Sequence, residues 1–337
     1  MHFFIDESGS FTGVGHGTSL SLIGALIVPD SRRGSLEREF KRLRRSLPQE
    51  DGEVKGRKMM EKDVAKVTPL LCHHDVIFEV IGIDLGLHTA EGLRRNQVRR
   101  AEAMTNGLTR EHSEGATNFA WTIRRELESH SLPLHVQSAL MFFLIKRLIE
   151  HGSMYWGQRK PRELEYFHWV IDAKGVLETP TAWEQWWSRV IMPWMQTECH
   201  SEPIHFFTEA DYSYMERFNL ADPTPFQTEL LRSDPNGPPP VDIKKLMTES
   251  LRFSSQAEPG LELVDIVTNA TRRALLGRLK PDGWDGIRAL MINRSPQNIQ
   301  IVSLDEAVKD RPAVPYGATL KTFNLGGRSM IANKRRR

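Results

Sequence analysis

Two apolar runs near the start of the chain place the strongest constraint on its fold. Residues 2–6 read HFFID, and residues 19–28 read SLSLIGALIV. Neither run alternates cleanly between apolar and polar residues, which is typical of strands that are covered on both faces. The segment between them contains four glycines, which favours a short hairpin connection. We therefore expect an early β-hairpin that is buried between other layers of the fold.

Later segments mix helices with strands, so we expect an α/β fold. Apolar periodicity and flanking residues predict helices at 35–47, 61–73, 132–151, 181–199 and 259–279. Further strands are predicted at 75–85, 165–175, 205–211 and 251–256. Ser35 is expected to cap the first helix, and Ser131 the third, which Gly152 would end.

Carboxylates also occur within or at the end of apolar segments at three places that are far apart in the sequence. The first predicted strand ends in Asp6, and the run Trp169-Val170-Ile171 ends in Asp172. Asp265 lies in an apolar helical stretch and has aliphatic neighbours on both sides. An isolated buried carboxylate costs several kcal/mol unless it is paired or coordinated. These positions are therefore candidates for a metal site.

A divalent cation reverses the repulsion within such a cluster. Mg²⁺ prefers oxygen ligands and keeps several waters, and two ions about 3.5–4 Å apart can stabilise both the attacking and the leaving oxygen of a phosphodiester. The alternative is that each residue serves a turn, since Asp6 could accept N–H bonds from Ser8 or Gly9. Only convergence of the three residues in space would favour the metal site.

Four segments together resemble the DUF3800 family, and the resemblance spans residue 3 to about residue 275. They are Phe4-Ile5-Asp6-Glu7-Ser8-Gly9, Glu53-Val54-Lys55-Gly56, Val170-Ile171-Asp172, and Ser255 followed by Gly260-Leu261 and Leu263-Val264-Asp265-Ile266-Val267. The family is similar to ribonuclease H-like folds, with a mixed sheet of about five strands flanked by helices. The resemblance implies a nuclease that depends on Mg²⁺ or Mn²⁺, with two ions.

The resemblance also implies roles for individual residues. Asp6, Asp172 and Asp265 would hold metal and carry catalysis, with Glu53 as a fourth carboxylate. Glu7 and Ser8 would flank the site, and Lys55 could face a phosphate. On the predicted helix, Asn269 and Arg272 lie four and seven residues after Asp265, so we expect them on its face, in contact with substrate. If the first strand continues, Glu7 points away from Asp6 because successive side chains alternate.

The chain departs from the family pattern in places. Glu262 and Val264 stand where the family usually has Gln and Ala, and a helix is expected between the second and third strands. We expect one ribonuclease H-like domain over residues 1–330, with a helical insertion at about 91–152. The basic tail 331–337 is expected to be disordered.

Composition narrows the function classes. The net charge is +2, so a nucleic-acid surface would have to be a local patch. The two cysteines, Cys72 and Cys199, are far apart and fit a reducing cytosol. The longest apolar run is about half the length that a membrane helix needs. We expect a soluble cytoplasmic protein without a membrane partner.

The expected activity is hydrolysis of phosphodiester bonds in DNA or RNA. The alternative is an inactive ribonuclease H-like scaffold that binds nucleic acid or a protein. The context of the family implies a third possibility, which is action within a multi-protein assembly in defence against foreign nucleic acid.

Two other motifs favour structural roles. Cys72-His73-His74 offers soft ligands, but adjacent residues do not easily face one metal, so we do not expect zinc there. The tryptophans at 183, 186, 187 and 194 are expected in the core rather than as platforms for base stacking.

Overall fold

The sheet at the centre of the molecule is mixed. The computed structural model describes residues 1–173, 181–191, 194–195, 204–221, 241–294, 297–305 and 314–332. Within them, six strands form one sheet in the order β7-β6-β1-β2-β5-β8. These strands are β1 (His2–Ser8), β2 (Leu20–Val28), β5 (Ile77–Asp84), β6 (His168–Asp172), β7 (Leu251–Ser254) and β8 (Gln300–Val302). Neighbours pair antiparallel across β1–β2–β5, and parallel at β1–β6, β6–β7 and β5–β8.

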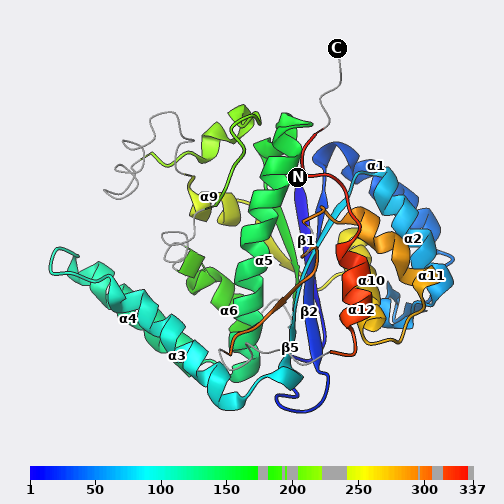
Figure 1. The fold of residues 1–337 in the computed structure, drawn as a ribbon. Coiled ribbons are helices and arrows are strands. Elements are labelled where there is room, and N and C mark those ends of the chain that lie inside the picture. The colour runs from blue at the N-terminus through cyan, green and yellow to red at the C-terminus, as the bar shows by residue number, and fades with distance from the viewer. Residues whose placement is uncertain are drawn as a thin grey trace.

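Helices cover both faces of this sheet (Figure 1). One face packs against α5 (Leu132–Gly157) and α6 (Ala182–Arg189). The other packs against α1 (Asp30–Arg44), α2 (Glu61–His73), α10 (Pro259–Leu275), α11 (Pro281–Trp284) and α12 (Gly317–Asn324). Successive residues of β1 alternate between the two cores, since Phe3 and Ile5 face α5 while Phe4 faces α10. The predicted α/β class is confirmed.

The remaining elements are smaller or lie at the edges. The helices α3 (Ala90–Asn106) and α4 (Glu114–Ser129) form a hairpin that extends away from the sheet (Figure 1). The strands β3 (Gln49–Glu50) and β4 (Glu53–Val54) form a separate two-stranded ribbon. The other helices among the described residues are α9 (Ile243–Thr248) and the 3₁₀ turns η1 (Gly56–Lys58), η2 (Leu85–Leu87), η3 (Pro161–Glu165), η4 (Ser213–Phe218) and η5 (Asp285–Leu290).

Several predicted boundaries are confirmed. The helix predicted at 61–73 has those bounds in α2, and the early hairpin is present as β1 and β2. Ser131 caps α5, because its Oγ accepts a hydrogen bond from the Leu134 N–H. The four predicted tryptophans are buried in the core on the α5 side of the sheet.

Other predictions were wrong. Helix α1 begins at Asp30 after Pro29, so Ser35 lies inside the helix and does not cap it. Gly152 does not end α5, which continues to Gly157 because its surroundings are buried and packing outweighs the low helix propensity of glycine. Residues 205–211 form no strand. Strand β8 was missed, since three residues give too short a pattern to detect.

The region predicted as a helical insertion has two parts. Helices α3 and α4 project from the fold, whereas α5 packs on β2 and β5 as a covering layer. The predicted helix at 181–199 and the strand at 165–175 extend into residues outside the described ones, as does most of the predicted tail, from residue 333.

One helix among the described residues, α5, is long and apolar enough to cross a membrane. Of the 18-residue segment of α5 that meets this criterion, 67% is buried inside the fold. Buried core helices of soluble proteins can have the same length and composition, so this is weak evidence of a membrane span.

Candidate functional site

A cleft of about 320 Å³ opens on the α10 side of the sheet. Five of the predicted site residues line it: Asp6, Glu53, Lys55, Asp172 and Asp265. They come from β1, from β4 and the residue after it, from β6, and from α10. Residues separated by more than 250 positions in the sequence therefore line one cleft.

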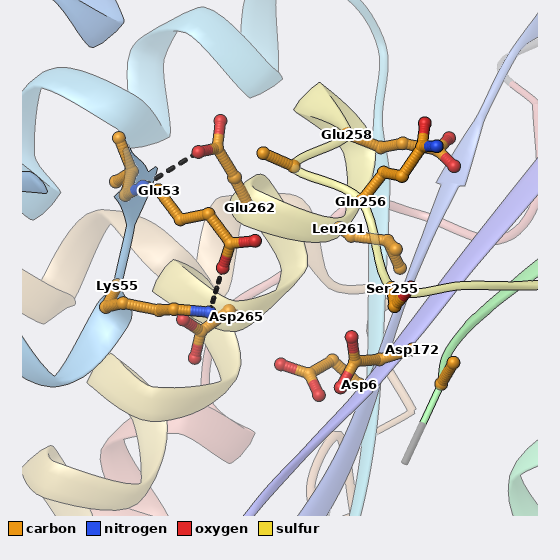
Figure 2. A pocket seen from close by; sticks show the side chains of 13 residues that line it. Asp6, Glu53, Lys55, Asp172, Ser255, Gln256, Glu258, Leu261, Glu262 and Asp265 are labelled. Atoms are coloured by element: carbon orange, nitrogen blue, oxygen red, sulfur yellow. Dashed lines mark hydrogen bonds and ion pairs between the residues drawn. The ribbon is translucent and has the colours of Figure 1, made fainter. Parts of the chain in front are cut away.

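The sheet fixes the first two carboxylates. Strands β1 and β6 run parallel with Ile5 opposite Ile171, so Asp6 and Asp172 follow at the same level. Ile5 and Ile171 face α5. Because successive side chains of a strand point to opposite faces, Asp6 and Asp172 point toward α10. Figure 2 shows them beside each other, across the cleft from Asp265 and Lys55.

Two backbone hydrogen bonds dock the segment from Glu53 to Gly56 on α10. The Val54 N–H donates to Glu262 Oε1 over 2.7 Å, and the Gly56 N–H donates to Asp265 Oδ2 over 2.7 Å. A Cβ at position 56 would lie 2.5 Å from the Asp265 carbonyl oxygen, so this close approach requires glycine. The docking leaves Glu53 and Lys55 lining the cleft.

Arg44 strengthens this docking from α1. Its Nε lies 2.8 Å from Glu262 Oε2 and its Nη2 lies 2.8 Å from Glu262 Oε1, which is a bidentate ion pair. Its Nη2 also donates to the Gly52 carbonyl oxygen. Glu262 is only 5% exposed, so the pair is largely withdrawn from water. Hydrogen bonding to Glu262 raises the pKa of the Arg44 guanidinium.

Charge is unevenly distributed in the cleft. Burial raises the pKa of Asp265, and nearby Asp172 raises it further, while the Gly56 N–H and Lys55 oppose both. The Lys55 ammonium forms an ion pair with Glu53 (Figure 2), and this contact raises the pKa of Lys55, with Asp265 and Asp172 adding to the effect. Lys55 thus supplies positive charge where the carboxylates converge.

The other predicted site residues do not line the cleft. Ser8 and Asn269 contact each other, with Asn269 Nδ2 3.4 Å from Ser8 Oγ. Glu7 lies on the opposite face of β1 from Asp6, as strand alternation predicts. The Nε of Arg272 donates to the Leu20 carbonyl oxygen over 2.7 Å, which ties this side chain to β2.

Sequence reasoning missed some polar residues of the cleft. Its lining also includes Ser255, Gln256, Glu258 and Glu262. Glu262 was noted only as a departure from a family pattern. Its spacing of three residues from Asp265 could have placed both carboxylates on one helix face.

The donor spacing in the cleft is wider than in a compact metal group. Among the described residues, two sets of His, Asp or Glu have ligand atoms that all lie within 4.8 Å of one another: His2, Asp30 and His168, and Glu39, His73 and His74. The cleft carboxylates form neither set. Their donors are all oxygen, which is the chemistry that Mg²⁺ and Mn²⁺ prefer.

Comparisons with protein-family models, with curated proteins and with solved structures found no match to this chain. The likeness to the DUF3800 family therefore rests on the four sequence segments alone.

Proposed function

We propose that the cleft is the active site of a metal-dependent nuclease that hydrolyses phosphodiester bonds of DNA or RNA. The observation that carries this proposal is the meeting of Asp6, Glu53, Asp172 and Asp265 in one cleft with Lys55. Carboxylates that gather at such a cost need a compensating charge. Among the described residues that line the cleft, Lys55 is the one cation.

The arrangement of the fold supports a ribonuclease H-like assignment within this proposal. The family resemblance implies carboxylates from the first strand, from the fourth strand and from the last long helix, around a mixed sheet. Here Asp6 lies on β1, Asp172 on β6, which is the fourth strand of the main sheet in chain order, and Asp265 on α10.

Each residue has a distinct task in this proposal. Asp6 and Asp172 are held by the sheet and would form the fixed part of the metal site. Asp265 and Glu53 would complete it from the side of α10. Four carboxylates offer more donor oxygens than one Mg²⁺ with retained waters uses, so we propose two ions. When bound, such ions lower the pKa of water and neutralise charge on the phosphate.

Lys55 would act on the substrate. Its ammonium is paired with Glu53 and lies near Asp265 and Asp172. With metal bound to the carboxylates, the ammonium would be available to contact a phosphate oxygen of the substrate.

The test is cleavage of single-stranded, duplex and hybrid substrates with Mg²⁺ or Mn²⁺. Wild-type protein should cleave at least one substrate, and EDTA should stop it. Asp6→Asn should lose the activity, while Asp282→Asn, which changes an exposed acid of α11, should retain it. Full activity in Asp6→Asn would overturn the mechanism.

A second candidate is a scaffold that binds nucleic acid without cutting it. The Lys55–Glu53 ion pair favours it, because a cleft whose acids are already partly neutralised has less need of metal. Binding that persists in EDTA, with no cleavage of any substrate, would support this candidate.

A further inference from the structure

The strands that carry Asp6 and Asp172 also carry a matched pair of histidines. Strand β1 reads HFFID from His2, and β6 reads HWVID from His168. The two histidines are direct partners in the parallel register. Each precedes its aspartate by four residues, so all four side chains lie on one face of the sheet, with the pairs about 13 Å apart.

The histidine pair is closely packed and has an acidic neighbour. The two imidazole rings stack with centroids 4.4 Å apart and planes 14° apart. Asp30, the first residue of α1, places Oδ1 2.7 Å from His2 Nε2. The ligand atoms of the three residues all lie within 4.8 Å of one another. His2 is 3% exposed, whereas the Asp30 side chain is 69% exposed, so the group opens to solvent at Asp30.

We propose that His2, His168 and Asp30 form a binding site for a transition-metal dication of the Zn²⁺ class. Two nitrogens and one carboxylate oxygen are a donor set that suits Zn²⁺ and disfavours Mg²⁺. A water on the exposed side would complete a tetrahedral site. Asp30 would exchange its contact with His2 Nε2 for the ion, and its exposed side chain leaves room for this change.

A neighbouring hydroxyl prepares His168 for this role. Its Nδ1 lies 2.7 Å from Ser250 Oγ, which leaves Nε2 for the ion. Hydrogen bonding of the distal ring nitrogen is the usual way in which proteins fix the tautomer of a metal-binding histidine. Burial lowers the pKa of His2 to about 4 and also lowers the pKa of His168.

Arg33 competes with metal at His2. Its Nη1 lies 3.4 Å from His2 Nδ1, and its Nε lies 2.8 Å from Glu37 Oε1. If metal bound His2 through Nε2, the proton of the neutral ring would lie on Nδ1. The Nδ1–H and the guanidinium of Arg33 would then both be hydrogen-bond donors facing each other, which is unfavourable. Arg33 must then turn fully toward Glu37. Removing this guanidinium should therefore tighten metal binding.

The group of Glu39, His73 and His74 serves as an internal control. It lies on α1 and on the end of α2, with His74 Nε2 3.1 Å from Glu39 Oε2. Glu39 and His73 lie on the surface, and only His74 is buried. Zinc that bound here would respond to changes at Glu39 and not to changes at Asp30.

The experiment is titration of the full chain, without a histidine tag, with Zn²⁺ by calorimetry and with Co²⁺ by visible absorption. We expect one site whose affinity falls by about tenfold or more in Asp30→Asn and in His168→Gln. Affinity should be unchanged in Glu39→Gln and should rise in Arg33→Met. Excess Mg²⁺ should not displace the ion.

Asp30 is exposed, so Asp30→Asn tests the site without disturbing the core. The proposal is overturned if wild-type protein binds no Zn²⁺, or if Asp30→Asn and His168→Gln bind it as wild type does. The proposal does not rest on nuclease activity, because Asp6→Asn should keep the zinc site intact.

Discussion

The two ends of the β1–β6 strand pair share one geometry but carry different side chains. At the start of the strands, His2 and His168 stack against each other, and one exposed acid from α1 joins them. Four residues later, Asp6 and Asp172 occupy the same register and face a cleft with further acids and Lys55. The strands fix the spacing within each pair. The covering elements decide which other donors arrive, and in our proposals this difference makes one end suit Mg²⁺ and the other Zn²⁺.

The largest expected effect separates the two ends by function. Asp172→Asn should reduce metal-dependent cleavage by roughly a thousandfold, because an ion that loses a fixed ligand no longer offers several kcal/mol of charge stabilisation. Zn²⁺ affinity should stay the same in this variant. The measurements are cleavage rate with Mn²⁺ and Zn²⁺ titration. A parallel loss of Zn²⁺ binding would show that the two ends are not independent.

The next effect concerns how the acidic end is assembled. Arg44→Met leaves the buried Glu262 carboxylate without its cation, so we expect a loss of about 2–3 kcal/mol in unfolding free energy, less than for a fully buried pair because Arg44 is partly exposed. Urea denaturation measures the change. The double variant Arg44→Met/Glu262→Gln should recover part of the loss. A double variant less stable than Arg44→Met would contradict this account.

The smallest effect is a pH dependence at Asp265. Burial raises the pKa of this carboxyl in the folded protein, so the folded state holds its proton more tightly than the unfolded state does. Ionised Asp265 therefore opposes folding once the pH rises through the folded pKa, and has no such effect below the unfolded pKa. Asp265→Asn should raise the melting temperature of metal-free protein at pH 7, and this gain should shrink as the pH falls toward 4.

The same comparison of Asp265→Asn with wild-type protein should be repeated in saturating Mg²⁺. Wild-type protein should gain stability from Mg²⁺, whereas Asp265→Asn should gain less because it has lost a negatively charged ligand. An advantage of the variant that is the same at every pH would rule out titration of Asp265 as its cause.

The sequence predicted local features well where they depend on nearby residues. The bounds of α2, the cap at Ser131 and the position of Asp172 at the end of its strand follow from local patterns. The first strand was predicted to end in Asp6, but β1 continues to Ser8. The matched histidines were visible in the sequence too. Their meaning depended on the register between β1 and β6, which is set by pairing across more than 160 residues.

Contacts between distant elements could not be predicted. Nothing near Arg272 indicates that its guanidinium binds the Leu20 carbonyl, and nothing near Asp30 indicates His2 as its neighbour. Glu262 was visible as an acid in an apolar helix. Its bond to Val54 and its ion pair with Arg44 depend on how α10, the β3–β4 ribbon and α1 pack.

The hydrogen bond from Gly56 to Asp265 has a consequence for ion size. It engages Oδ2, so within the proposed site Asp265 would present chiefly Oδ1 to a cation. Large ions such as Ca²⁺ commonly take both oxygens of a carboxylate and six to eight ligands, whereas Mg²⁺ accepts single oxygens in a tight octahedron. The Gly56 amide would thus make Asp265 a ligand through one oxygen, and this would favour binding of Mg²⁺ over Ca²⁺ in the cleft.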